Sequence, residues 1–208
     1  MIKNIVLDFG HGGLNKFGQY TTAPNKMHTY PCGEVAYEGV LNREIGARLH
    51  KKLDNTNLNV VATVDADDSR DKSLSYRVRV ANTYNPKETI FISIHSNAFN
   101  GDVRGFEIYT TVGTTESDKV AENVYNEVSE LYSELKLRLR HDFSDGDPDK
   151  EVDFYVLRKT KCPAVLIECL FFDNWEDFKF LKDKCFQEKL ANAIYKGIIN
   201  YVDNSNNI

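Results

Sequence analysis

Short apolar runs alternate along this chain with segments in which apolar residues recur at helical spacing. Six runs have the length and apolar character of buried strands: 2–8, 58–64, 89–95, 105–111, 153–157 and 164–168. Four longer segments have the helical period: 38–53, 74–84, 116–135 and 187–202. Strands that alternate with helices predict an α/β fold, in which a mostly parallel, twisted sheet is flanked by helices on both faces.

The remaining segments are loops. Residues 12–34 are rich in glycine and proline, and so long a loop is usually kept for function. Residues 141–153 are acidic, with glycine and proline, and predict a second, mobile loop. Because no linker divides the chain, we expect a single domain over 1–203, followed by a frayed, disordered tail at 204–208.

Composition excludes several classes of partner. The chain has 208 residues and a formal net charge of −5, which argues against nucleic acid, because nucleic-acid binding requires a basic patch. The sequence has no run long enough for a transmembrane helix, so we expect no membrane insertion. Since the first residues lack the pattern of a signal peptide, we expect synthesis in the cytoplasm and another route to any site outside it. The four cysteines form no CxxC pair and suggest no disulfide framework.

Two histidines stand at the ends of strand-like runs. His11 follows Ile5-Val-Leu and lies among glycines, and His95 follows Thr89-Ile-Phe-Ile. Open α/β sheets bind their ligands beyond the carboxyl ends of the strands, so both imidazoles are expected in one crevice. The two histidines therefore indicate half of a metal site.

A catalytic zinc site requires a third protein ligand. Glu38 is the best candidate, because it lies in the first turn of the helix predicted over 38–53, at the edge of the face that meets the sheet. Glu34, beside Gly33, is the rival. An ordinary carboxylate favoured by the helix dipole is the alternative interpretation of Glu38.

Another carboxylate, Glu168, follows four apolar residues at the end of the run 164–168. Burying such a charge is costly unless it is paired, hydrogen-bonded or close to a metal. At the end of a central strand Glu168 would project into the same crevice as the histidines, where it is suited to proton transfer. Glu107, in the run 105–111, either pairs with Arg104 or lines the crevice, and a structural role is favoured.

Four motifs now occur in order: Gly10-His11-Gly12-Gly13, Glu38-x-x-x-Asn42, Ser93-Ile-His95-Ser-Asn97-Ala98 and Pro163-Ala-Val-Leu-Ile-Glu168. This arrangement resembles the zinc-dependent N-acetylmuramoyl-L-alanine amidases of the Amidase_3 type, found in bacterial autolysins and phage endolysins. The likeness extends from Ile5 to about Val202.

The resemblance implies a zinc ion held by His11, Glu38 and His95, with Glu168 as the catalytic carboxylate. It also implies that Asn97 and Arg158 help to hold the substrate. The substrate would be peptidoglycan, cleaved at the amide between N-acetylmuramic acid and the L-alanine of the stem peptide.

The chain departs from the family pattern at three places. Glu168 is followed by Cys-Leu-Phe-Phe, Thr63 by Val64 where the family commonly has arginine, and the first loop carries an unusual segment at 27–32. These differences concern substrate preference and suggest a phage-type lysin. Two other functions remain open: a zinc amidohydrolase or peptidase acting on another amide, and a catalytically inactive wall-binding module.

Overall fold

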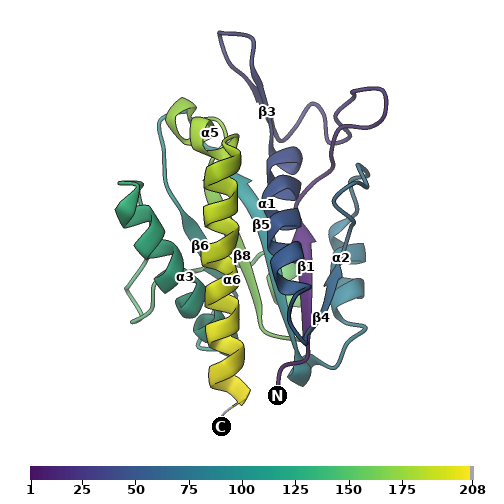
Figure 1. Cartoon of the computed structure of the whole chain (residues 1–208), viewed down its shortest axis with the longest axis vertical. Helices are drawn as coiled ribbons and strands as arrows, with labels where there is room; N and C mark the ends of the chain where they lie inside the picture. The colour runs from purple at the N-terminus through teal and green to yellow at the C-terminus, as the bar shows by residue number, and fades with distance from the viewer. Residues whose placement is uncertain (207–208) are drawn as a thin grey trace.

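The computed structural model describes residues 1–206 and is built on one six-stranded sheet (Figure 1). Its strand order is β4-β1-β5-β8-β6-β7. The strands have the following bounds: β1 Asn4–Phe9, β4 Asn59–Ala62, β5 Thr89–Asn97, β6 Glu107–Thr110, β7 Lys150–Glu151 and β8 Ala164–Phe171. Strands β4, β1, β5 and β8 are parallel, whereas β6 runs antiparallel to β8. The predicted mostly parallel sheet is confirmed.

Helices cover both faces of the sheet, as predicted. The larger core lies between one face and three helices: α1 (Glu38–Leu53), α3 (Glu116–Glu134) and α6 (Lys184–Asn206). The smaller core lies between the other face and two helices, α2 (Leu74–Ala81) and α4 (Tyr155–Lys159). No helix within residues 1–206 combines the length and apolar character needed to cross a bilayer.

Helix α1 shows how the sequence pattern sets the packing. Leu41, Ile45, Leu49 and Leu53 recur along one face and are all buried in the larger core. Each such side chain contributes about 1.5–3 kcal/mol when it leaves water, so this face fixes the orientation of α1 on the sheet. That orientation carries Glu38, at the start of the helix, to the carboxyl end of the parallel strands.

A short hairpin interrupts the long loop predicted over 12–34. Strands β2 (Met27–Thr29) and β3 (Val35–Tyr37) pair in antiparallel fashion and project beyond the sheet, above α1 in Figure 1. The short helices α5 (Trp175–Leu181) and η1 (Pro86–Glu88) were also not predicted. Elements of three to seven residues show too few periods for a pattern to identify them.

Two sequence predictions are wrong. The run 153–157 is no strand: Tyr155–Lys159 forms helix α4, and the Arg158 N–H donates to the Phe154 carbonyl. After β7 the chain crosses to the face that carries α2, where Val156 and Leu157 pack in the smaller core without a strand partner. The predicted disordered tail is also corrected at 204–206, because α6 continues to Asn206. Residues 207–208 lie outside the described part of the chain.

Candidate metal centre

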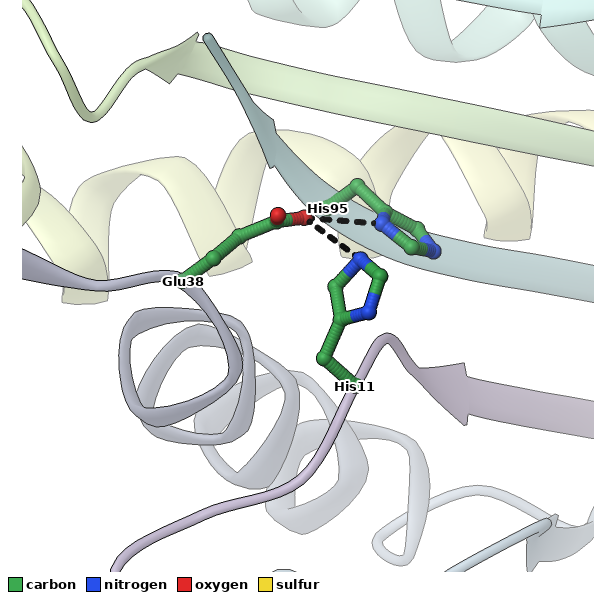
Figure 2. A group of neighbouring side chains, drawn as sticks. All are labelled: His11, Glu38 and His95. Atoms are coloured by element: carbon green, nitrogen blue, oxygen red, sulfur yellow. Dashed lines mark hydrogen bonds and ion pairs between the residues drawn. The ribbon is translucent and has the colours of Figure 1, made fainter. Parts of the chain in front are cut away.

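Three elements bring His11, Glu38 and His95 together, as Figure 2 shows. Glu38 Oε1 lies 2.9 Å from His95 Nδ1 and 3.2 Å from His11 Nε2. One ligand atom from each of the three residues lies within 4.8 Å of the others. We call these three residues the His–Glu–His cluster. Glu34 lies outside it, because its carboxylate is exposed and pairs with Lys182 at 2.5 Å.

The backbone before the first ligand is adapted to this arrangement. Gly10 passes so close to the ring of His95 that a Cβ atom would lie 2.2 Å from its Cε1. His11 itself has a φ of 65°, a left-handed conformation that is unusual for a residue with a side chain. Backbone strain of this kind persists where the surrounding structure holds it and is concentrated at functional sites.

A buried ion pair between Arg77 and Asp8 supports the backbone around His11. Arg77 Nη1 donates to Asp8 Oδ1 and to the Phe9 carbonyl, both at 2.7 Å, and Nη2 donates to the His11 carbonyl. Burial raises the pKa of Asp8, but the charge of Arg77 and a hydrogen bond from Thr63 outweigh it and keep the pKa below its usual value. The guanidinium therefore ties the end of β1 and the His11 backbone into one rigid unit.

Asn42, one turn after Glu38 on α1, contacts the Glu38 carboxylate and the backbone or side chain of a neighbour of each histidine. Its Nδ2 donates to the Gly10 carbonyl at 3.2 Å and lies 3.4 Å from Glu38 Oε1, while its Oδ1 accepts from Ser96. Such outer contacts fix the direction of metal ligands. Residues four apart lie on one face of a helix, so the spacing between Glu38 and Asn42 places their side chains in contact.

The electrostatics of the cluster favour an ionised Glu38 carboxylate beside a neutral His95 imidazole. Burial raises the pKa of Glu38, but the contacts from His11 and His95 outweigh it and lower the pKa well below the usual value. Burial lowers the pKa of His95, against the opposing effect of Glu38. Neutral imidazoles and a carboxylate are the forms that bind zinc.

Whether a metal fits is tested by the atoms left without partners. His11 Nε2 and Glu38 Oε2 are both buried and make no well-formed hydrogen bond. Buried polar atoms are nearly always hydrogen-bonded, so two such atoms in one cluster indicate that a ligand completes it. Two histidines and one carboxylate are a ligand set of catalytic zinc. The cluster therefore fits a zinc ion.

Glu168 lies beside the cluster, on the neighbouring strand. His95 of β5 is paired in register with Glu168 of β8, so their side chains share one row at the carboxyl end of the sheet. Glu168 Oε2 is also buried without a hydrogen-bond partner. Burial and the charge of Glu38 raise the pKa of Glu168 well above its usual value. Such a carboxyl group is suited to taking up and releasing a proton.

His11, His95 and Glu168 line a cleft of about 650 Å³ together with Lys26. Apolar and aromatic residues complete the lining: Leu74, Phe154, Tyr155, Val156 and Leu166. We call this hollow the cleft. A pocket that combines apolar walls with a few convergent polar groups is the usual form of a small-ligand site.

The two predicted substrate contacts lie away from the lining of the cleft. Asn97 lines a separate hollow of about 230 Å³, and its Nδ2 donates to Glu107 Oε2 at 2.6 Å. Arg158 is exposed on α4, where its Nε donates to Asp153 Oδ1 at 2.5 Å. Both roles stay predictions.

Sequence reasoning missed two parts of the site. The Asp8–Arg77 pair was open to prediction, because Asp8 directly follows a buried apolar run and a charge there needs a partner. Lys26 gave no signal, since it lies in a loop and faces the cleft only because of how the hairpin folds. The proposed pairing of Glu107 with Arg104 is wrong: Glu107 pairs with Arg140 and Lys150, whereas Arg104 pairs with Asp177.

The fold and the site define an α/β protein with a candidate His–Glu–His metal centre beside a buried glutamate. The chain belongs to the N-acetylmuramoyl-L-alanine amidase family Amidase_3, whose sequence model matches residues 5–200. The resemblance seen in the four motifs is thereby confirmed.

Relatives and solved structures agree with this membership. The chain is 29% identical over 201 residues to the uncharacterized protein YqiI of Bacillus subtilis, covering 97% of this chain and 85% of that protein. It is 29% identical to the endolysin of Bacillus phage SPP1 and spans 65% of its length. A crystal structure of N-acetylmuramoyl-L-alanine amidase from Clostridium difficile 630 superposes with a TM-score of 0.74, at 28% identity and 97% coverage of both chains.

Proposed function

We propose that this protein is a zinc-dependent peptidoglycan hydrolase that cleaves the amide between N-acetylmuramic acid and the L-alanine of the stem peptide. The observation that carries the proposal is the His–Glu–His cluster, with two buried unpartnered atoms, next to Glu168 in one cleft. Membership of the amidase family supports the reaction class and the wall polymer as substrate. The site of action would be the bacterial cell wall, because peptidoglycan is the polymer of that wall.

His11, Glu38 and His95 would hold the zinc ion. When bound, zinc supplies a Lewis acid for the scissile carbonyl and makes a water molecule more acidic. The protein contributes the geometry: Asn42 fixes the Glu38 carboxylate, and the Asp8–Arg77 pair fixes the backbone of His11.

Glu168 would move the proton. As general base its carboxylate takes a proton from the attacking water while the new carbon–oxygen bond forms at the lactyl carbonyl. As general acid it then passes that proton to the nitrogen of L-alanine, so that the carbon–nitrogen bond breaks and a neutral amine leaves. A raised pKa suits the second half of this cycle, because the carboxyl group then releases its proton readily only to a strong base such as the departing amine.

The test is digestion of purified peptidoglycan, with the soluble products identified by mass. We expect free stem peptides that begin at L-alanine, their loss on addition of a chelator, and recovery when zinc is restored. Cleavage at a different amide would keep the metal site and overturn the substrate assignment. Tight binding to the wall without any released product would instead support a binding module.

A further inference from the structure

The hairpin β2–β3 places a lysine directly opposite the metal-ligating glutamate. Met27 pairs with Tyr37 at the base of the hairpin, so the next pair outward is Lys26 and Glu38. The Glu38 N–H donates to the Lys26 carbonyl at 3.0 Å, which extends the ladder by that pair. The Lys26 ammonium reaches the cleft, where it lies 3.5 Å from Glu38 Oε2.

The far end of the hairpin is anchored to the domain. Tyr30 donates its hydroxyl proton to the Phe172 carbonyl at 2.8 Å, and its ring stacks on Phe178 with centroids 5.1 Å apart. With the tip packed and the base joined to α1, the backbone of Lys26 is held in place, and only its side chain needs to be ordered on binding. This segment is the part of the first loop that departs from the family pattern.

Lys26 differs from the other cations that line the cleft. Lys72 lies 3.7 Å from Asp68 and over the ring of Tyr76, and Arg77 is buried against Asp8. Among residues 1–206, the only carboxylate within 4.0 Å of the Lys26 ammonium is Glu38. A dication bound by the His–Glu–His cluster would compensate the charge of Glu38 and leave Lys26, with 49% of its side chain exposed, free to attract another anion.

The chemical groups of the proposed substrate limit which anion Lys26 can bind. In the proposed reaction the lactyl carboxyl group of the sugar is consumed in the scissile amide, so the sugar offers no charge beside it. Carboxylates near the scissile bond belong to the stem peptide, first of all to the residue after L-alanine, which carries either a free carboxylate or a carboxamide. An ammonium separates these two forms, because it attracts the charged form and gains little from the neutral one.

We propose that Lys26 is a specificity-determining residue that binds the free carboxylate of the stem-peptide residue following L-alanine. The inference rests on the proposed amidase function. It assigns the hairpin β2–β3 a role as the arm that sets preference between acidic and amidated stem peptides.

The experiment compares two N-acetylmuramoyl dipeptides that differ only at the residue after L-alanine, one with a carboxylate and one with a carboxamide. In the zinc-loaded enzyme, Lys26→Gln should raise KM for the carboxylate peptide up to about fivefold, as expected for a partly exposed ion pair, and change KM for the amide less than about twofold. Lys26→Glu should invert the preference. The matched control is Lys72→Gln, which removes a cleft-lining ammonium already paired with Asp68 and should keep the wild-type ratio of the two KM values.

Two further measurements separate the possible failures. Bound zinc is measured in each variant to detect any damage to the metal site. A rise in KM of equal size for both peptides, with or without loss of zinc, would overturn the specificity role. Affinity of both peptides is also measured by calorimetry for zinc-loaded Glu168→Gln with and without Lys26→Gln. If the wild type cleaves neither peptide, the proposed function fails. The Lys26 inference fails separately if Lys26→Gln leaves the affinity for the carboxylate peptide unchanged or lowers both affinities equally.

Discussion

Two buried glutamates flank Glu168, and their surroundings differ in kind. Three neighbouring strands present one row of side chains at the edge of the sheet, since His95 pairs with Glu168 and Glu168 pairs with Glu107. At the His95 end of the row lies Glu38, whose carboxylate contacts the imidazoles of His11 and His95. Glu107 forms the other end of the row, and its carboxylate is surrounded by hydrogen-bond donors.

Glu107 has all the partners that a buried carboxylate needs. Its Oε1 accepts from Arg140 Nε at 2.9 Å and from Lys150 Nζ at 2.5 Å, and its Oε2 accepts from Tyr109 and Asn97. Burial raises the pKa of Glu107, but the contacts with Lys150 and Arg140 outweigh it and lower the pKa. Its charge is compensated within the protein, so removing that charge would leave its cationic partners without an acceptor.

Glu38 is equally buried but incompletely satisfied. One carboxylate oxygen and one nitrogen of the adjacent His11 lack hydrogen-bond partners. The contrast shows that burial of a charge does not by itself distinguish a functional glutamate from a structural one. What distinguishes the two is whether the surrounding polar groups are complete without a ligand.

The largest expected effect belongs to Glu168, between the two. Glu168→Gln should lower kcat about a thousandfold, because the amide cannot accept and return the proton. Bound zinc should remain at one equivalent, because the ligands are untouched. The measurement is kcat on a muramoyl peptide together with metal analysis. Turnover within about tenfold of the wild type would remove Glu168 from the mechanism.

Glu38→Gln should weaken zinc binding by two orders of magnitude or more, because a neutral amide replaces the only charged ligand. The wild type should show a higher unfolding temperature with zinc than with chelator, by mass action, and the variant should lose that difference. Glu34→Gln is the matched control, since Glu34 is exposed and pairs with Lys182. A Glu34 variant that loses zinc while the Glu38 variant keeps it would reverse the assignment.

Glu107→Gln should show the opposite behaviour and sharpen the comparison. We expect a loss of about 1–3 kcal/mol in the free energy of unfolding, because Arg140 and Lys150 lose a charged acceptor. The zinc content should not change. Urea unfolding at saturating zinc gives the free energy, and loss of zinc without loss of stability would contradict the structural role.

A smaller effect concerns a carboxylate that is buried like Glu107 but has no cationic partner among residues 1–206. Burial raises the pKa of Asp149 to about 7, with Asp147 adding to the shift and a hydrogen bond from Thr110 opposing it. The folded protein therefore keeps this proton up to about pH 7, whereas the unfolded chain releases it near pH 4. Because the unfolded state binds fewer protons in this window, the group lowers stability as the pH rises from 4 to 7.

Asp149→Asn should remove that loss. At pH 8 we expect the variant to unfold about 2–4 °C above the wild type, corresponding to roughly 1 kcal/mol, with the difference vanishing near pH 4. Asp145→Asn, an exposed change in the same loop, is the control and should leave the unfolding temperature unchanged at both pH values. A gain that does not depend on pH would refute the assigned ionisation.

Strong periodicity explains what could be predicted of the fold. Helix α1 has the predicted bounds, because four leucine and isoleucine residues repeat along one face and all enter the core. The run 153–157 failed because five apolar and polar residues fit a short strand and a short helix equally well. The chain's crossing to the α2 face decided between them, and no local pattern encodes that crossing.

The sequence alone determined the types of the candidate ligands and their places at the ends of strands or the start of a helix, because apolar runs, glycines and charged residues are local features. It identified His11, His95 and Glu168 in this way, and it favoured Glu38 over Glu34 by motif. Only the tertiary structure decided which polar groups are complete. Lys26 contacts Glu38 because of the register of a hairpin whose two strands have three residues each, and Glu107 pairs with Lys150 from the neighbouring strand. Such contacts join residues far apart in the chain, so their energies depend on packing that no single segment specifies.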